Sequence, residues 1–129
     1  MLESRDAACL EVMKKNIPYL DYDFSYFLYT PDTFYVKVTI RDKQATLDLV
    51  LLNPFAGLHY REVLKRVFND CYIVYVYILD SNVRSKRFVS GIGFQYDGRL
   101  RQHVGGIDLL IFSLTKEEFE KHVQRKRNG

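Results

Sequence analysis

Hydrophobic and polar positions alternate along the chain with two different periods, and each period predicts a different kind of element. Residues 5–16 repeat apolar side chains at helical spacing, which predicts a helix. Residues 25–30 form an aromatic run that predicts a short strand ending at a Pro-Asp turn. Residues 34–41 alternate strictly between apolar and polar side chains. We therefore expect a strand there with one face in a core and the other, including Lys37, in solvent.

The middle of the chain predicts a hairpin followed by a crossover. The tetrapeptide RDKQ turns the chain into a second strand over residues 45–52, antiparallel to the first. Residues 58–70 carry one apolar stripe and one charged face, which predicts an amphipathic helix. The run YIVYVYIL in residues 72–79 is apolar on both faces, as in a central parallel strand covered on both sides. Strand, helix and strand together predict one right-handed crossover unit.

The last third predicts a helix, a hairpin and a helical tail. Asp80 or Ser81 caps a short helix over residues 82–90. A strand begins at Phe94, and a Gly-Gly pair turns it into a last strand over residues 107–114. The following TKEE is a capping box that begins the terminal helix. This order predicts an α/β fold with a mixed sheet whose single crossover lies in the middle.

Length and composition narrow the class of protein. A chain of 129 residues with 47% hydrophobic content predicts one packed domain, residues 1–129. The net charge of +3 permits an anionic ligand such as a phosphorylated cofactor, and it does not indicate nucleic acid. Two isolated cysteines give neither a disulfide framework nor a metal-ligand pattern. With no signal-peptide core and no apolar run of membrane-spanning length, we expect a protein of the reducing cytoplasm.

An ordered set of residues in the second half has the spacing of a known motif. Its members are Asn82, Ser85, Arg87, Gly93-Phe94, Asp97-Gly98, Leu100-Arg101, Asp108, Ser113-Leu114 and Glu118. The set resembles the C-terminal half of the GNAT acetyltransferase superfamily. Within it, the similarity is closest to the branch that acetylates the N-termini of ribosomal proteins and small-molecule amines. The matched region covers residues 72–119.

The resemblance implies a fold and a cofactor. The fold is a mostly antiparallel mixed sheet with flanking helices, in which two central parallel strands splay apart around acetyl-CoA. The pantetheine arm binds unpaired backbone of the first of these strands, and the pyrophosphate binds at the start of the following helix. Asn82 contacts the cofactor arm, and Ser85 protonates the departing thiolate. The cofactor-binding positions carried over to this sequence are Leu51, Leu52, Gly57, Asn82 and Arg87.

The phosphate-binding turn departs from the family pattern. The family has Gln or Arg, two residues, Gly, one residue, then Gly or Ala, whereas this chain has NPFAGLHYREVL. Only one glycine, Gly57, is present, and the proline removes an amide donor. The side chain of Arg61, Lys65 or Arg66 would then meet the phosphates directly. The alternative is that these cations are the solvated face of an amphipathic helix.

Three further positions each have two interpretations. Amine acetylation needs a proton acceptor, and Asp48 is the candidate base in the strand TLDLVLL. Asp48 alternatively lies on a solvent-facing edge. Ser85 is either the catalytic acid or a serine on a helix surface, and Asn82 is either a cofactor ligand or a helix N-terminal residue.

Three functions remain open at this point. The first is an acyl-CoA-dependent N-acetyltransferase whose acceptor is an amine or a protein N-terminus. The second is a non-catalytic binding or structural protein on the same fold, such as a phage virion-type component, with a protein partner or a second copy as its ligand. The third, a nucleic-acid binder using VRSKRF and HVQRKRNG, is disfavoured by the matching acidic residues.

Overall fold

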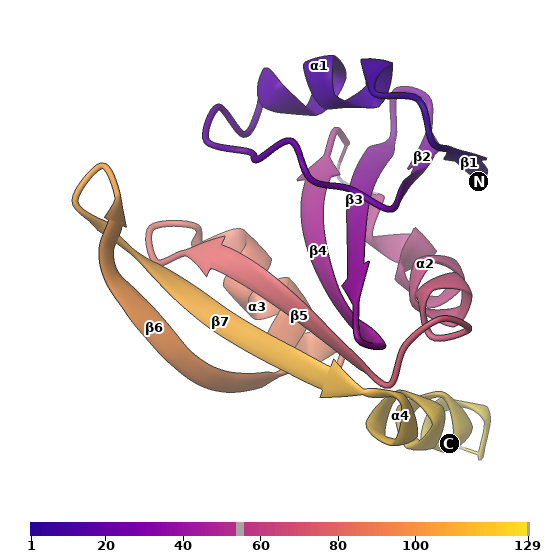
Figure 1. Ribbon diagram of the computed structural model, residues 1–129. Helices are drawn as coiled ribbons and strands as arrows, with labels where there is room; N and C mark the ends of the chain where they lie inside the picture. The colour runs from indigo at the N-terminus through magenta and orange to yellow at the C-terminus, as the bar shows by residue number, and fades with distance from the viewer. Residues whose placement is uncertain (54–55, 129) are drawn as a thin grey trace.

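The computed structural model describes residues 1–53 and 56–128, and it contains one seven-stranded sheet with the order β1-β2-β3-β4-β5-β7-β6 (Figure 1). The strands are β1 (Leu2–Ser4), β2 (Tyr26–Thr30), β3 (Phe34–Arg41), β4 (Gln44–Leu51), β5 (Ile73–Leu79), β6 (Gln95–Val104) and β7 (Ile107–Thr115). The helices are α1 (Ala8–Lys14), the 3-10 helix η1 (Ala56–His59), α2 (Tyr60–Val67), α3 (Val83–Gly91) and α4 (Lys116–Asn128).

The predicted fold class is confirmed. Neighbouring strands of the sheet are antiparallel except β4 and β5, which are parallel and joined through α2. The tight turn between β3 and β4 has positive φ at Asp42 and Lys43, at 51° and 61°, as a two-residue hairpin turn requires. The central crossover and the hairpin before it are therefore arranged as the sequence predicts.

Two element boundaries differ from the prediction. The N-terminus forms β1, which was not predicted and pairs with β2. Helix α1 consequently begins at Ala8, whose amide is bound by the Asp6 carboxylate at 2.9 Å. The helix predicted over residues 58–70 is shorter, because the chain first forms η1 and the α-helical part spans only Tyr60–Val67.

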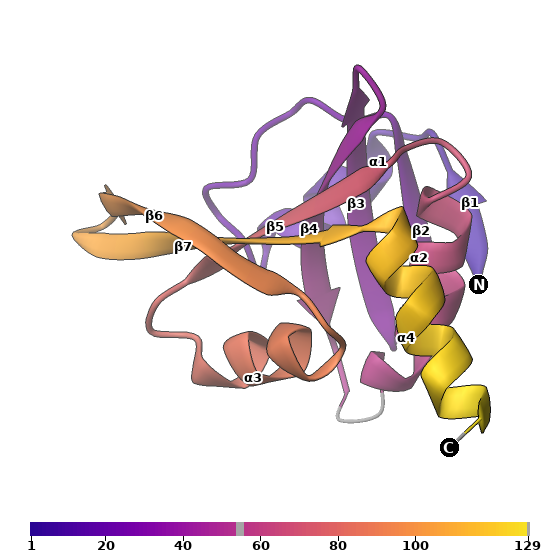
Figure 2. The same cartoon turned by 90° about the horizontal axis from the view of Figure 1, so that it is seen from below.

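Apolar side chains form two cores, one on each side of the sheet. The larger core packs α2, α3 and α4 against the sheet through residues such as Leu64, Val89 and Phe119. Figure 2 shows α3 and α4 on the same side of the sheet. The smaller core packs Leu10 and Met13 of α1 against the opposite side. The sheet is therefore covered on both sides in its first half.

Two predictions about strand faces are wrong. The face of β3 that contains Lys37 is not in solvent, because α1 and the segment after it cover that face and leave Lys37 only 1% exposed. Strand β5 is not covered on both sides. Its Val74, Val76 and Ile78 are buried, but Tyr77 on the other face is 37% exposed.

The last two strands form a long hairpin that extends away from the rest of the sheet (Figure 1). The motif pair Asp97-Gly98 lies within β6, at a register shift between Tyr96 and Gly98. The capping box is confirmed, since the Thr115 and Glu118 side chains each bind the other's backbone amide. Among the described residues, no helix is long and apolar enough to cross a membrane.

Candidate functional site

The two parallel strands separate halfway along their length. Four register pairs join them, from Gln44–Ile73 to Leu47–Val76. Beyond this point β4 continues to Leu51 and β5 to Leu79, each paired only with its other neighbour in the described sheet. Figure 1 shows β4 and β5 diverging from a common origin. The end of β4 therefore presents backbone groups toward β5 that have no ladder partner there.

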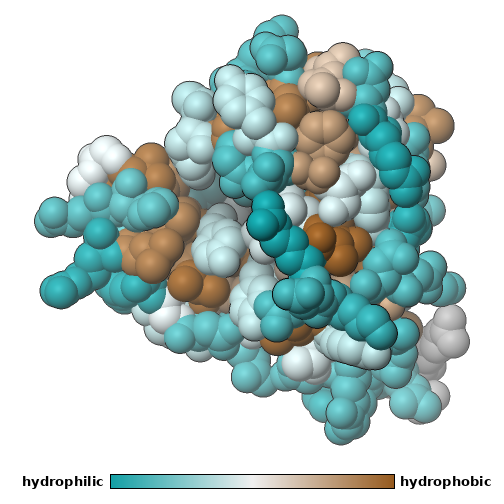
Figure 3. Space-filling view, viewed as in Figure 1, coloured by the Kyte–Doolittle hydropathy of each residue, from teal (hydrophilic) through white to brown (hydrophobic). Residues whose placement is uncertain are grey.

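A cleft of about 380 Å³ occupies this opening. Its walls come from the diverging ends of β4 and β5, from the first turn of α3 and from the segment after α1. In Figure 3 the surface is hollowed between the β6–β7 hairpin and the N-terminal part of the sheet. The volume is within the range typical of small-molecule sites.

The structure brings five of the eight predicted site residues together in the lining of the cleft: Asp48, Leu51, Gly57, Asn82 and Ser85. The other three lie outside it. Leu52 is exposed and its amide donates to the Thr33 carbonyl at 2.8 Å. Arg61 borders a separate groove between α2 and α4, and Arg87 is exposed on α3.

Asn82 and Ser85 are held by the start of α3. The Asn82 side-chain oxygen accepts the Ser85 amide at 3.1 Å, so Asn82 is the N-cap of the helix. The predicted caps, Asp80 and Ser81, are therefore wrong. Asp80 instead forms an ion pair with Lys86 at 2.9 Å. Because the cap fixes the first turn of α3, it also fixes the Ser85 side chain at the wall of the cleft.

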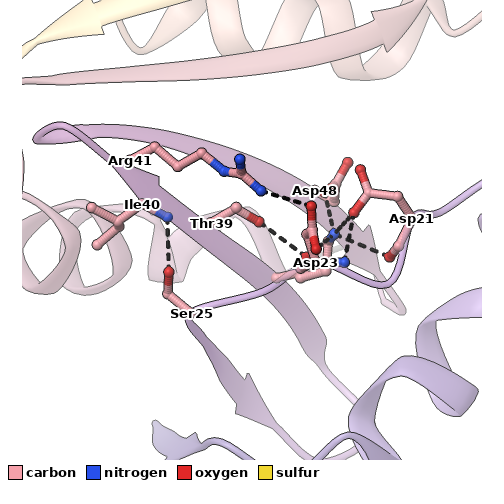
Figure 4. A network of polar contacts seen from close by, with 8 residues as sticks. Asp21, Asp23, Ser25, Thr39, Ile40, Arg41 and Asp48 are labelled. Atoms are coloured by element: carbon pink, nitrogen blue, oxygen red, sulfur yellow. Dashed lines mark hydrogen bonds and ion pairs between the residues drawn. The ribbon is translucent and has the colours of Figure 1, made fainter.

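Asp48 borders the cleft from β4 and lies beside a buried amine. Lys37 is its cross-strand neighbour, and the Lys37 Nζ is 3.7 Å from the Asp48 carboxylate. The same Nζ donates to the Asp21 carboxylate at 2.6 Å, to the Asp21 carbonyl at 3.1 Å and to the Asp23 carbonyl. Figure 4 shows Asp21, Asp23 and Asp48 converging on this cluster. Lys37 thus ties the segment after α1 to the strand that carries Asp48.

The surroundings of Asp48 raise the pKa of its carboxyl group. Burial raises the pKa of the Asp48 carboxyl above its ordinary value, and the Lys37 ammonium offsets this only in part. The Asp21 charge raises the pKa of Asp48 further. The pKa of Tyr19, which also borders the cleft, is raised by burial and then by the Asp48 charge. A carboxylate of raised pKa at a cleft wall is suited to accept a proton near neutral pH.

The cleft wall also contains polar and aromatic residues that were not predicted as site residues, among them Tyr19, Tyr77 and Arg84. Tyr19 comes from an aromatic, acidic segment without clear periodicity, so its direction could not be predicted from the pattern of residues. Tyr77 was assigned to a buried strand face. Arg84 belongs to the basic helix and lies between Asn82 and Ser85 in the sequence. Of these three residues, it is the one that could have been predicted, from its position within that motif.

The predicted phosphate-binding turn is described only in part, since Pro54 lies outside the described residues. Its glycine, Gly57, is in η1 and packs against the ring of Phe88. A Cβ at position 57 would lie 2.8 Å from Phe88 Cε2, which explains why glycine fits there. Within the described residues no group of three or more His, Cys, Asp or Glu side chains is arranged to hold a metal ion.

No protein-family model matches the sequence, and no curated protein matches it. Solved structures do match. A chimera of the Vibrio cholerae spermidine N-acetyltransferase SpeG and hSSAT has a TM-score of 0.71 at 12% identity, covering 94% of this chain and 99% of that one. The aminoglycoside acetyltransferase AAC(6')-Ib in complex with coenzyme A has a TM-score of 0.59 at 18% identity, covering 74% of this chain and 68% of that one.

A GNAT-family acetyltransferase from Bacillus anthracis has a TM-score of 0.58 at 15% identity, covering 67% of this chain and 60% of that chain. At these identities the likeness shows the fold and not the activity. The chain has the GNAT acetyltransferase fold, and its cleft lies where the two parallel strands of that fold separate.

Proposed function

We propose that this chain is an acyl-CoA-dependent N-acyltransferase of the acetyltransferase type. The observation that carries the proposal is the coincidence of three features at one place. The parallel ladder ends at Leu47–Val76, a cleft of about 380 Å³ opens there, and Asp48, Asn82 and Ser85 all border it. The fold it shares with acetyltransferases supports the same activity.

The residues present fit a coenzyme A thioester. The unpaired edge of β4 supplies backbone partners for the amides of a pantetheine arm. Asn82 adds a side-chain amide at the α3 wall, and Arg84 adds a guanidinium beside it. Because the turn before α2 has a single glycine, we assign phosphate binding to side chains such as Arg84 and Arg61. Leu51 borders the cleft, whereas Arg87 and Leu52 lie outside its lining, so Leu51 is the better placed of the three for cofactor contact.

When bound, the thioester supplies an activated carbonyl carbon for attack by an amine. Asp48 accepts the proton that the amine nitrogen loses as the new C–N bond forms, directly or through a water molecule. As the C–S bond breaks, the Ser85 hydroxyl donates a proton to the leaving sulfur and recovers one from solvent. Lys37 does not touch the reactants and acts as a positioning residue, because it holds Asp48 and the Tyr19 segment together.

The acceptor we propose is a primary amine, with a protein N-terminus as the preferred class. The support for this class is the ordered motif from Asn82 to Glu118, which resembles the branch that acetylates N-termini. The solved structures with this fold include enzymes named for spermidine and for aminoglycosides, which are also amines. The side of the cleft bordered by Tyr19, Asp48 and Tyr77 is where the amine would enter.

The second candidate is a non-catalytic binding or structural protein with the same fold, as in a phage virion-type component. The observation that favours it is the short helix α2, which spans eight residues and follows a turn with one glycine. Such a protein would bind a macromolecular partner or a second copy instead of a cofactor. Coenzyme A binding separates the two candidates.

Calorimetric titration with coenzyme A and acetyl-CoA tests the proposal. The expected result is micromolar binding that Asn82→Ala weakens and that Ser90→Ala, at the exposed far end of the same helix, leaves unchanged. Because Asn82 also caps α3, the midpoint of urea unfolding is measured for each variant to show that the helix remains folded. No binding by the folded wild-type protein at millimolar ligand would overturn the enzyme and favour the second candidate.

A further inference from the structure

A second, smaller cavity adjoins the cleft on the side of the sheet covered by α2 and α3. Its volume is about 40 Å³, and it lies between β4, η1 and the inner faces of the two helices. Val63 and Leu64 of α2 and Val89 of α3 form its far wall. These three residues border this cavity and not the cleft. It is therefore a space distinct from the cleft, bordered mainly by residues of the larger core.

The cavity and the cleft meet at the point where the parallel strands separate. Six residues border both spaces: Leu47, Leu49, Leu51, Gly57, Val76 and Phe88. The Phe88 ring lies against Gly57 and also meets Tyr60 edge-on, with ring centroids 6.2 Å apart. Phe88 and Gly57 thus lie on the boundary between the cleft and this smaller apolar cavity.

The cavity wall is almost entirely hydrocarbon. The two polar residues that border it use their polar atoms elsewhere. Tyr60 Oη lies 3.5 Å from His122 Nε2, and His59 Nδ1 lies 4.0 Å from the Glu62 carboxylate. The His59 ring itself packs on Phe34, with centroids 5.2 Å apart. A cavity with such a lining favours apolar groups over water, since a water molecule needs polar partners.

The size of the cavity limits what it can hold. One water-sized atom group needs roughly 10–15 Å³ by the same measure, so the cavity accommodates about three carbon atoms. An acetyl group has a single methyl group beyond its carbonyl and would leave this space empty.

We propose that the cavity holds the hydrocarbon end of an acyl group longer than acetyl. The expected length of this acyl group is about four to five carbon atoms, counting the carbonyl carbon. The inference rests on the proposed function, because it places the thioester carbonyl in the cleft near Leu47 and Val76. The acyl chain then passes between β4 and Phe88 into the cavity. Each methylene group moved from water into this cavity is expected to increase affinity by about fourfold.

A series of acyl-CoA thioesters tests the inference by calorimetry. The ligands are coenzyme A and its acetyl, propionyl, butyryl, pentanoyl and octanoyl thioesters. The expected affinity rises by roughly tenfold or more from acetyl to butyryl or pentanoyl and falls again at octanoyl, which exceeds the cavity. Val63→Ile adds one methyl group to the far wall and should shorten the preferred chain by about one carbon.

Val12→Ile is the matched control, because Val12 is half-buried in α1, across the sheet from the cavity. It should leave the preferred chain length unchanged. Binding of acetyl-CoA with no gain for any longer chain overturns this inference and leaves the proposed function standing. Absence of binding by coenzyme A itself overturns the proposed function and the inference with it. An equal shift in Val12→Ile would show that the preference does not come from the cavity.

Discussion

Replacing Lys37 with methionine probes the buried charge cluster that supports the cleft. The change keeps the length of the side chain but removes the amine that binds Asp21, the Asp23 carbonyl and Asp48. Two consequences follow. The segment after α1 loses one of its attachments to β3, and Asp48 loses the cation that partly offsets its burial.

The expected magnitude follows from the exposure of each partner. Breaking a fully buried ion pair costs about 3–5 kcal/mol of stability. The Asp21 carboxylate is 76% exposed, so water replaces its lost partner, whereas the Asp48 side chain is only 23% exposed. We therefore expect Lys37→Met to lower the free energy of unfolding by about 2–3 kcal/mol near neutral pH.

The loss should depend on pH with a definite sign. Lys37 lowers the pKa of Asp48, so its removal raises that pKa further above the ordinary value. A carboxyl whose pKa is higher in the folded state opposes folding once it ionises. The destabilisation by Lys37→Met is therefore smaller at pH 5 and grows as the pH rises through the folded-state pKa of Asp48.

Urea unfolding at pH 5 and pH 8 measures both effects. Arg41→Met is the control, because the Arg41–Asp23 pair is 73% and 70% exposed and should contribute less than about 1 kcal/mol. The double variant Lys37→Met/Asp48→Asn should recover part of the loss at pH 8. A loss in Lys37→Met no larger than in Arg41→Met, and equal at the two pH values, would refute the reasoning.

Three further predictions concern the site and the last helix. Asp48→Asn should lower the rate of acyl transfer by about 100-fold or more. With an aniline acceptor, which is neutral above pH 5, a steady-state pH profile should show that the rise of rate with pH is lost. An unchanged profile would exclude Asp48 as the base. Gly57→Ala should displace the Phe88 ring, because the new Cβ would lie 2.8 Å from Phe88 Cε2. In competition binding, the substitution should therefore reduce the affinity for long-chain acyl-CoA more than the affinity for acetyl-CoA. An equal reduction for both ligands would contradict this. Thr115→Ala removes the hydroxyl that accepts the Glu118 amide at 3.1 Å and should cost about 1 kcal/mol in urea unfolding, whereas no loss would mean that the cap is not formed in solution.

The sequence predicts the arrangement of the elements well where local signals and tertiary packing agree. The hairpin turn, the crossover and the Thr115 capping box each depend on residues close together in the chain, and each is present. The short strand β1 could not be predicted, because three residues of mixed polarity become a strand only through pairing with β2.

The site was predictable only in part, and Lys37 shows why. Alternation along β3 gives the period of the strand but does not say whether a second layer covers its polar face. The lysine is buried because carbonyl groups and a carboxylate from the segment after α1 replace its water. The same limit applies to Asp48, whose direction depends on where β4 separates from β5. Ser85 and Asn82 were predictable as a pair, because their spacing within one helical turn sets their geometry.

Backbone amide resonances measured during a titration with coenzyme A test the central claim most directly, since they report where the ligand binds. The account predicts that the largest shifts occur at residues 48–51 of β4 and 82–85 of α3, with Asp6–Lys14 unchanged. Shifts confined to the groove between α2 and α4, or no shifts at millimolar coenzyme A, would contradict it.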